Sequence, residues 1–411
     1  MTTLPVNFQV SARIRQLALL IACAVTLSAC TTQTVKTVNS VPIDKADQEL
    51  SQEQLLDVGL QIFDPGIPAD QKDQDDDNIY PAVRRAEARY VPYLLKTTLE
   101  ESNQWGAVRV LPGNDPSSEV TVTGEIRHSD GVVLEVRVTV TDATGRQWLD
   151  KKYADLATQF AYRDDVDYQG DAFQDLYNLV ANDIRKARDE LSREELTQIR
   201  TVANLRYAAE VAPDAFGEHL SEDKNGDVVI NRLPAYDDPM MRRVNRIRES
   251  EFLFIDTVDQ QYAVFYQQMD PSYDQWRRYS YEETLAEEDI KRSARTRALA
   301  GLLGVVGGAA ISSSANGNWA QNSIGNAAAL GGLYALKQSY DTYQEAKIHQ
   351  EALKELAASF DAEVKPIVLE VEGEVVKLNG SLDAQYKEWR RLMREIYETE
   401  TGIPVADAVP Q

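Results

Sequence analysis

The chain has 411 residues, a formal net charge of −23 and a hydrophobic fraction of 43%. This hydrophobic fraction is near the usual globular level and argues against wholesale disorder. The length predicts two or three domains at about 150 residues each. The acidic charge argues against nucleic acid and anionic lipid headgroups as partners of the general surface, because like charges repel.

Residues 1–29 have the organisation of a secretory signal peptide. Arg13 and Arg15 precede an apolar run over 17–29, and small residues precede Cys30. This order is typical of a cleaved export signal. The apolar run is shorter than the roughly 20 residues that a transmembrane helix needs. An ordinary signal followed by an incidental cysteine is the alternative interpretation.

The signal ends in a tetrapeptide that resembles the lipobox of bacterial lipoproteins, Leu27-Ser28-Ala29-Cys30. By this resemblance Cys30 becomes the first residue of the mature protein and carries its acyl chains. More than one chain gives stable membrane anchoring. Thr31, where an Asp would favour the inner membrane, points by the same resemblance to the outer membrane. Cys23 leaves with the signal, so the mature chain has no internal disulfide and no Cys-based zinc site.

Residues 30–78 predict a lipidated tether followed by an acidic loop. Residues 31–50 are polar and rich in Thr, which is typical of a flexible linker. Asp70–Asp77 is a carboxylate run in a segment of loop composition. It lacks the spacing of an EF-hand calcium loop, as does Asp223–Asp227, so we interpret both as solvated loops.

Residues 79–191 predict a small α/β sandwich with an antiparallel-rich sheet. Apolar residues at helical spacing over 83–99, interrupted by Pro92, come first. Alternation then predicts one packed and one wetter sheet face. The expected strands are 107–111, 120–126, 132–141 and 146–153. The expected turns are Ser129–Gly131 and Asp142–Gly145.

A final helix closes this predicted sandwich. Asp171, with Gln174 three residues later, predicts a capping box, and apolar residues follow at helical spacing as far as Leu191. The order helix, strands, helix weakly resembles the compact domains of periplasmic accessory lipoproteins, such as those of curli secretion and of penicillin-binding-protein activation. The resemblance implies a binding module.

Residues 192–282 form a mixed, aromatic-rich middle region. Ser192 and Glu195 predict a second capping box, whose helix ends at Pro213. Short apolar runs follow at Phe252–Ile255 and Tyr262–Tyr266. We interpret the region's aromatic residues as core or interface, with a sugar-binding platform as the alternative. These residues are Tyr236, Tyr262, Tyr266, Tyr273, Trp276, Tyr279 and Tyr281.

Residues 283–411 predict a helical region that contains a glycine-rich hairpin over 298–336. Two uncharged apolar runs, 298–311 and 324–336, flank a polar break. Glycine weakens a helix in water, but at helical spacing it lets two helices approach closely. The candidate helix-packing glycines are Gly301, Gly304, Gly307, Gly308, Gly325, Gly331 and Gly332.

This pattern resembles the glycine-zipper hairpins of envelope proteins. Three interpretations remain open for it: a membrane hairpin, a hairpin buried within the protein, and a surface for homo-oligomerisation. The first run is about 21 Å long as a helix, which is short of a hydrocarbon core of roughly 30 Å. Further on, alternation favours a strand within 367–378, and a last helix begins near Leu382 and ends at Gly402.

Catalytic and metal motifs do not emerge from the sequence. The three histidines, His128, His219 and His349, are far apart, and we interpret them as surface residues. The sequence has no nucleophile elbow, no phosphate-binding loop and no dinucleotide fingerprint. We therefore expect no catalytic residues, no metal site and no cofactor.

The sequence as a whole predicts an α+β lipoprotein on the periplasmic face of the outer membrane. We expect a non-enzymatic binding or assembly factor of the cell envelope, anchored by the lipid on Cys30 and facing a protein partner. A lipid-anchored hydrolase of peptidoglycan or another glycan is one alternative, since the chain has 66 acidic residues that offer carboxylate pairs. An oligomeric secretion or pore component is another.

Overall fold

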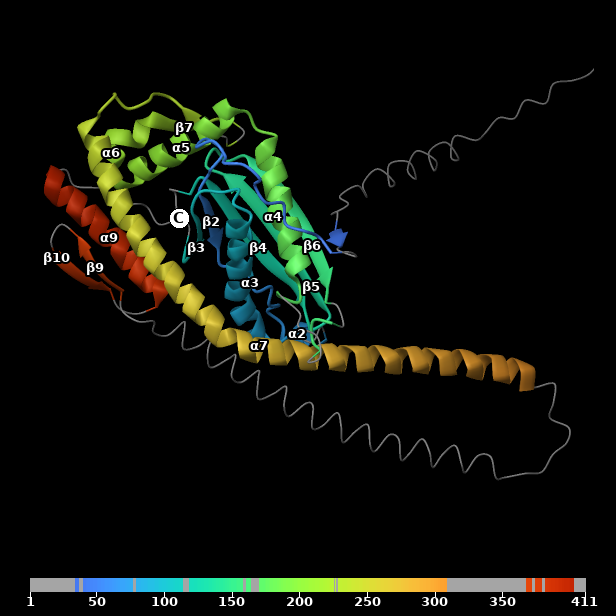
Figure 1. Cartoon of the computed structure of the whole chain (residues 1–411). Coiled ribbons are helices and arrows are strands. Elements are labelled where there is room, and N and C mark those ends of the chain that lie inside the picture. Colours follow the sequence, from blue (N-terminus) through green and yellow to red (C-terminus); the bar gives the residue numbers. More distant parts are fainter. Residues whose placement is uncertain are drawn as a thin grey trace, which may run out of the picture.

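The structure, a computed structural model, describes residues 34–36, 40–76, 79–113, 118–157, 160–163, 170–224, 226, 228–308, 367–371, 374–378 and 381–402. Its fold is α+β, as predicted, with a mixed sheet in the N-terminal half and a mainly helical remainder (Figure 1). Cys30, Gly325, Gly331, Gly332 and His349 lie outside these residues.

The main sheet has six strands in the order β1-β6-β5-β4-β2-β3. The antiparallel meander β4–β5–β6 forms its centre, and β1, β2 and β3 join in parallel. All four predicted strands and both turns are present. The strand bounds are β1 Thr34–Lys36, β2 Val58–Gln61, β3 Val108–Leu111, β4 Val120–Ser129, β5 Val133–Asp142 and β6 Gln147–Leu156.

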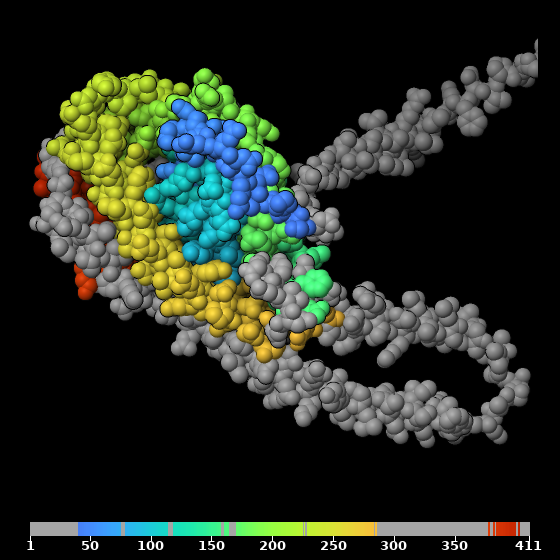
Figure 2. Space-filling model, viewed as in Figure 1, coloured from blue at the N-terminus to red at the C-terminus, as the bar shows by residue number. Residues whose placement is uncertain are grey.

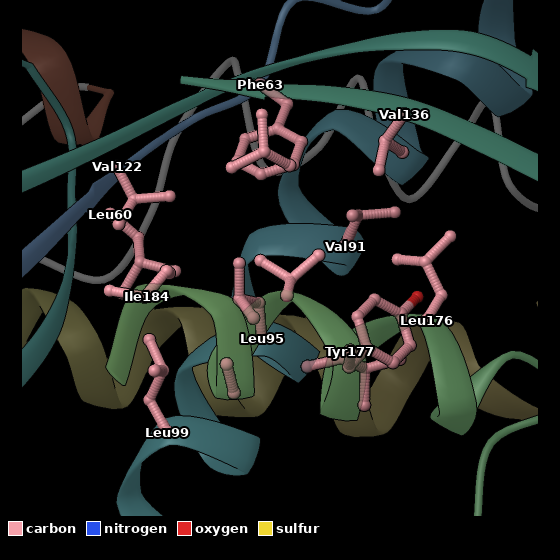
Figure 3. Packing of buried hydrophobic residues seen from close by; sticks show 14 of the residues in the cluster. Leu60, Phe63, Val91, Leu95, Leu99, Val122, Val136, Leu176, Tyr177 and Ile184 are labelled. Atoms are coloured by element: carbon pink, nitrogen blue, oxygen red, sulfur yellow. The ribbon is translucent and has the colours of Figure 1, made fainter. Parts of the chain in front are cut away.

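Helices α3 (Pro81–Glu101) and α4 (Gln174–Asp189) cover one face of this sheet (Figure 1). Phe63, which follows β2, and the strand residues Val122 and Val136 lie on the side of the sheet that faces the helices, where Leu95 and Tyr177 also pack (Figure 3). Along β5, buried residues alternate with half-buried or exposed ones, which confirms the packed and the wetter face. Pro92 lies inside α3 without dividing it.

Strand β2 and the segment over 40–46 differ from the sequence interpretation. β2 lies between β3 and β4, although its short run, VGLQ, carries little alternation. The segment over 40–46, expected as a flexible tether, is held along α4. Asp175 accepts a hydrogen bond from the Val41 amide (2.9 Å), and Asn182 accepts one from the Asp44 amide (2.8 Å). These side chains replace solvent as partners of the extended backbone.

Two further local predictions need correction. The acidic run contains a short helix, α2 (Gln71–Asp76), whose first turn is closed by the Asp70 side chain through the Lys72 amide. The Asp171–Gln174 capping box is wrong: α4 begins without a side-chain cap. Asp171 instead accepts a hydrogen bond from the Phe173 amide and forms a buried ion pair with another helix.

The middle region begins with helix α5 (Arg193–Val211), and its predicted capping box of Ser192 and Glu195 is confirmed. A short helix, a 3₁₀ turn and a hairpin follow: α6 (Pro213–Phe216), η1 (Gly217–His219), β7 (Leu220–Glu222) and β8 (Val228–Ile230). His219 is buried, and its ring nitrogen bonds the Arg232 carbonyl oxygen, so the surface interpretation of this histidine is wrong.

One helix, α7 (Pro239–Gly308), contains both apolar runs of the middle region and residues 298–308 of the first glycine-rich run. The sequence interpretation divided this stretch between two regions. The helix is continuous because one face is apolar at spacings of three and four residues. This buried face includes Val244, Ile247, Phe254, Ile255, Val258, Tyr262, Phe265, Met269, Tyr273 and Trp276.

The last described elements are a hairpin and a helix; the helix was expected, whereas the single strand expected within 367–378 is two paired strands. β9 (Ile367–Val371) pairs with β10 (Glu374–Leu378), and α9 (Leu382–Thr401) ends at Gly402, which has the left-handed φ of 67°. A second hydrophobic cluster joins α9 to α5, α7 and β3. Figure 2 shows α7, in yellow, running diagonally across the body beside the N-terminal segments.

Candidate functional site

Helix α7 is the element that brings together most of the residues of functional interest. Its 70 residues correspond to about 105 Å of helix. Figure 1 shows it following the body, bending, and then extending beyond the sandwich. Pro271 lies in the helix and removes one backbone hydrogen bond, which favours a bend. The helix therefore has one part bound to the body and one projecting part.

The projecting part carries four of the predicted glycines at its end. Tyr281 is still packed against the sandwich cluster, whereas Leu285, one turn further, is exposed. From there to Gly308 the helix continues for about 35 Å. Its last residues include Gly301, Gly304, Gly307 and Gly308. The second glycine-rich run of the predicted hairpin lies outside the described residues.

Among the contacts that hold α7 to the body, two contain several buried side chains each. We call the first the sandwich contact, which comprises Glu87, Tyr90, Asp171, Tyr273 and Arg277. An Arg277 Nη atom donates to an Asp171 carboxylate oxygen at 2.7 Å, and each side chain is 3% exposed. Nearby carboxylate and phenol groups keep the pKa of Arg277 well above its ordinary value, despite burial that opposes the charge.

Aromatic rings surround this buried guanidinium. It lies 4.5 Å from the ring centre of Tyr273 and 5.9 Å from those of Tyr90 and Phe173. The negative ring faces favour a cation there. The Tyr90 hydroxyl also donates to Asp270 at 2.7 Å. The middle-region aromatics Tyr262, Tyr273 and Trp276 are buried, which confirms their interpretation as core residues, whereas Tyr236 is fully exposed and is not a core residue.

Glu87 lies on the other side of Tyr273. Its carboxylate accepts hydrogen bonds from Tyr273 (2.7 Å) and Ser129 (2.5 Å), and the side chain is fully buried. Burial raises the pKa of Glu87, because desolvation disfavours the charged form, although Arg84 at 3.8 Å opposes this. A glycosidase acid also has a raised pKa but must reach its substrate. Glu87 is enclosed by its partners instead.

Glycine at one turn lets α7 lie directly on the sheet. Gly131 lies between β4 and β5, and a Cβ atom there would be 2.0 Å from the Arg277 carbonyl oxygen and 2.2 Å from the Tyr281 amide nitrogen. Such approaches are shorter than any real contact. The absence of a side chain at position 131 therefore sets where α7 crosses the end of this hairpin.

The second attachment, the α9 contact, comprises Glu251, Phe254, Trp389 and Arg390. The rings of Phe254 and Trp389 stack with centres 5.2 Å apart and planes 5° apart. Arg390 lies 3.5 Å from the Glu251 carboxylate and also pairs with Glu210 of α5. Since α9 follows β10 near the chain's end, this contact joins the C-terminal helix to the first part of α7.

The sequence analysis identified neither contact. Arg277 and Asp171 are 106 positions apart, and each residue type is usually solvated. One signal in the sequence could have identified the sandwich contact: Arg277 follows the apolar face of α7. A charged side chain that is buried with such a face needs a partner of opposite charge.

Metal and membrane sites have no candidates within the part of the chain that the structure describes. His128 is partly exposed and bonds Asp130 (2.9 Å). Among the described residues, no three His, Cys, Asp or Glu side chains gather as metal ligands. None of the described helices is both long and apolar enough to cross a membrane. Comparisons with family profiles, with curated proteins and with solved structures gave no match.

Proposed function

We propose that this protein is a lipoprotein of the outer membrane that faces the periplasm and acts, without catalysing a reaction, as an assembly factor of the cell envelope. Cys30 carries its lipid anchor. The end of α7 is its interaction element, through which copies of the chain associate.

The observation that carries the proposal is the course of α7. The helix packs on the body through both hydrophobic clusters and then leaves it, so its end is presented at a distance. That end is uncharged and has glycines at spacings of three, which allow close helix packing. An apolar segment that extends beyond the core is better explained by association with another chain than by the folding of this chain alone.

The N-terminal geometry fits an anchor at Cys30. β1 begins at Thr34 and pairs with β6, and residues 41–44 are bonded along α4. Four residues span at most about 14 Å. A lipid on Cys30 would therefore hold the β1–β6 edge of the sheet close to the membrane, with α7 free to reach other chains.

Fractionation of cells tests the anchor. The Cys30→Ala variant should move to the soluble periplasmic fraction, because its signal is no longer followed by an acylated residue. Cys23→Ala is the matched control, since it alters the other cysteine inside the signal, and it should stay in the membrane fraction. Unchanged membrane partition of Cys30→Ala would contradict the anchor.

A pore or secretion component is a second candidate, favoured by the same glycine-bearing end of α7. It differs in requiring a closed ring of chains. A ring-sized complex in detergent that conducts ions in planar bilayers would support it, whereas a small, non-conducting oligomer would favour the assembly factor.

A further inference from the structure

A cavity of about 450 Å³ lies between α3, α7 and the start of α4, beside the sandwich contact. Tyr93 and Tyr266 contribute its aromatic wall. Its charged lining is one guanidinium and four carboxylates: Arg277, Glu101, Asp171, Asp270 and Asp274. α3 and α7 lie side by side here (Figure 1), so residues of both helices face one space.

The cavity has an excess of negative charge. Arg277 forms an ion pair with Asp171 at 2.7 Å. Asp274 lies 3.8 Å from Arg277 and 3.6 Å from Arg278. Asp270 accepts a hydrogen bond from the Tyr90 hydroxyl. Burial keeps the pKa of Tyr90 well above 10, so this donor is neutral and does not compensate the Asp270 charge.

Aromatic rings adjoin these carboxylates. The Tyr266 ring stacks on Tyr90 with centres 4.7 Å apart, and Tyr93 lies 4.8 Å from Tyr266. Burial raises the pKa of Tyr266 to about 12, so its phenol stays neutral at physiological pH. Neutral tyrosine rings beside carboxylates are the set of groups that recognises ammonium and guanidinium ions.

Two cationic side chains of this protein already lie beside a tyrosine ring and a carboxylate near the cavity. Lys96 lies 5.6 Å from the centre of the Tyr93 ring and pairs with Glu100 (2.9 Å) and Asp259 (3.1 Å). Arg277 lies over Tyr273 and pairs with Asp171. Asp270 lines the cavity together with Arg277.

We propose that this cavity binds an organic cation, the ammonium or guanidinium group of a Lys or Arg side chain of a partner protein. The charged group pairs with Asp270, and its aliphatic stem lies against Tyr93 and Tyr266. The assignment of this cation to a partner protein rests on the proposed function as an assembly factor. The cation site itself does not depend on that function. A free polyamine has the same chemistry.

Calorimetric titration of the acylated full-length protein in mild detergent tests the site. The probes are acetylated, amidated tripeptides Gly-Lys-Gly and Gly-Arg-Gly, the same peptide with norleucine, and spermidine. The Lys and Arg peptides should bind at one site, and norleucine, which lacks the charge, should not. Tighter single-site binding of spermidine with no peptide binding would assign the cavity to a free polyamine.

Asp270→Asn should weaken peptide binding about tenfold, the loss of one charge-assisted contact. Asn still accepts the Tyr90 hydrogen bond, so the fold is kept, and circular dichroism checks this. Glu249→Gln is the matched control, since it removes one exposed charge from the same helix. Equal affinities of the two variants, or no binding of any cation at 10 mM as an order-of-magnitude limit, would overturn the cation site. Either result leaves the Cys30→Ala fractionation unaffected.

Discussion

The sandwich contact and the α9 contact of α7 use different chemistry. The sandwich contact centres on an ion pair, Arg277–Asp171, in which both side chains are 3% exposed and tyrosine rings surround the cation. The α9 contact combines a ring stack, Phe254 on Trp389, with an ion pair between the buried Glu251 and Arg390, which is 12% exposed. A buried charge that loses its partner remains in a poorly polarisable medium. A ring stack loses packing in proportion to the atoms removed. The sandwich contact should therefore be the more sensitive to a single substitution.

Arg277→Met should have the largest effect. It leaves the Asp171 carboxylate buried without its cation, which should lower the free energy of unfolding by about 3–5 kcal/mol. Urea unfolding followed by circular dichroism measures the loss. Arg391→Met, which removes an exposed arginine of α9, should leave the unfolding midpoint almost unchanged, because solvent screens exposed ion pairs. If the Asp171→Asn and Arg277→Met losses simply add in the double variant, the two residues are not coupled and the comparison fails.

Gly131→Ala should destabilise the same contact without altering its charges. A Cβ atom at position 131 meets the α7 backbone, which cannot rotate away, so α7 must shift. Overpacking of this kind costs about 1–3 kcal/mol. Gly217→Ala is the matched control, because a Cβ atom there meets nothing within 4 Å. Equal melting temperatures of the two variants would show that α7 does not lie on this turn.

Trp389→Phe should weaken the α9 contact by about 1–2 kcal/mol, because it leaves a small cavity but keeps a ring to stack on Phe254. The indole nitrogen of Trp389 is buried and has no hydrogen-bond partner among the described residues, so its removal offsets part of the loss. The readout is again urea unfolding. A loss larger than that of Arg277→Met would reverse the ranking of the two contacts.

Glu87→Gln should have the smallest effect on stability near neutral pH but should change its pH dependence. Because the folded pKa of Glu87 is raised above 4.5, the folded state binds its proton more tightly than the unfolded state. The free energy of unfolding should therefore fall as pH rises from 4.5 through the folded pKa. The glutamine variant lacks this decline. Parallel stability profiles of the two proteins from about pH 4.5 to 8 would show that burial does not perturb this carboxyl.

Whether a feature could be predicted from the sequence depends on whether the residues that stabilise it are close together or far apart in the chain. The strands from β3 to β6 and the Ser192 cap rest on neighbouring residues: alternation for the strands, and a side chain three residues from its amide for the cap. These predictions were confirmed. Asp171 has the same local signature, but Arg277, distant in sequence, competes for its carboxylate, and the predicted cap is absent.

The candidate site was the least predictable part. The glycines at 301–308 were identified from their spacing, but the continuity of α7 and its exit from the body depend on contacts with distant elements, namely α3, β3, α5, β9 and α9. β2 and the segment over 40–46 were missed because their backbones are bonded by distant strands and by α4 side chains. No pattern within these short segments reports such partners.

The central claim is that the glycine-bearing end of α7 mediates association of this chain. Its most direct test is the mass of the acylated protein in mild detergent, measured by light scattering for the wild type, the Gly304→Leu/Gly308→Leu variant and a variant lacking 298–336. The account predicts an assembly of several chains for the wild type and a folded monomer for both variants. A monomer in all three cases, or an equally large assembly in all three, would contradict it.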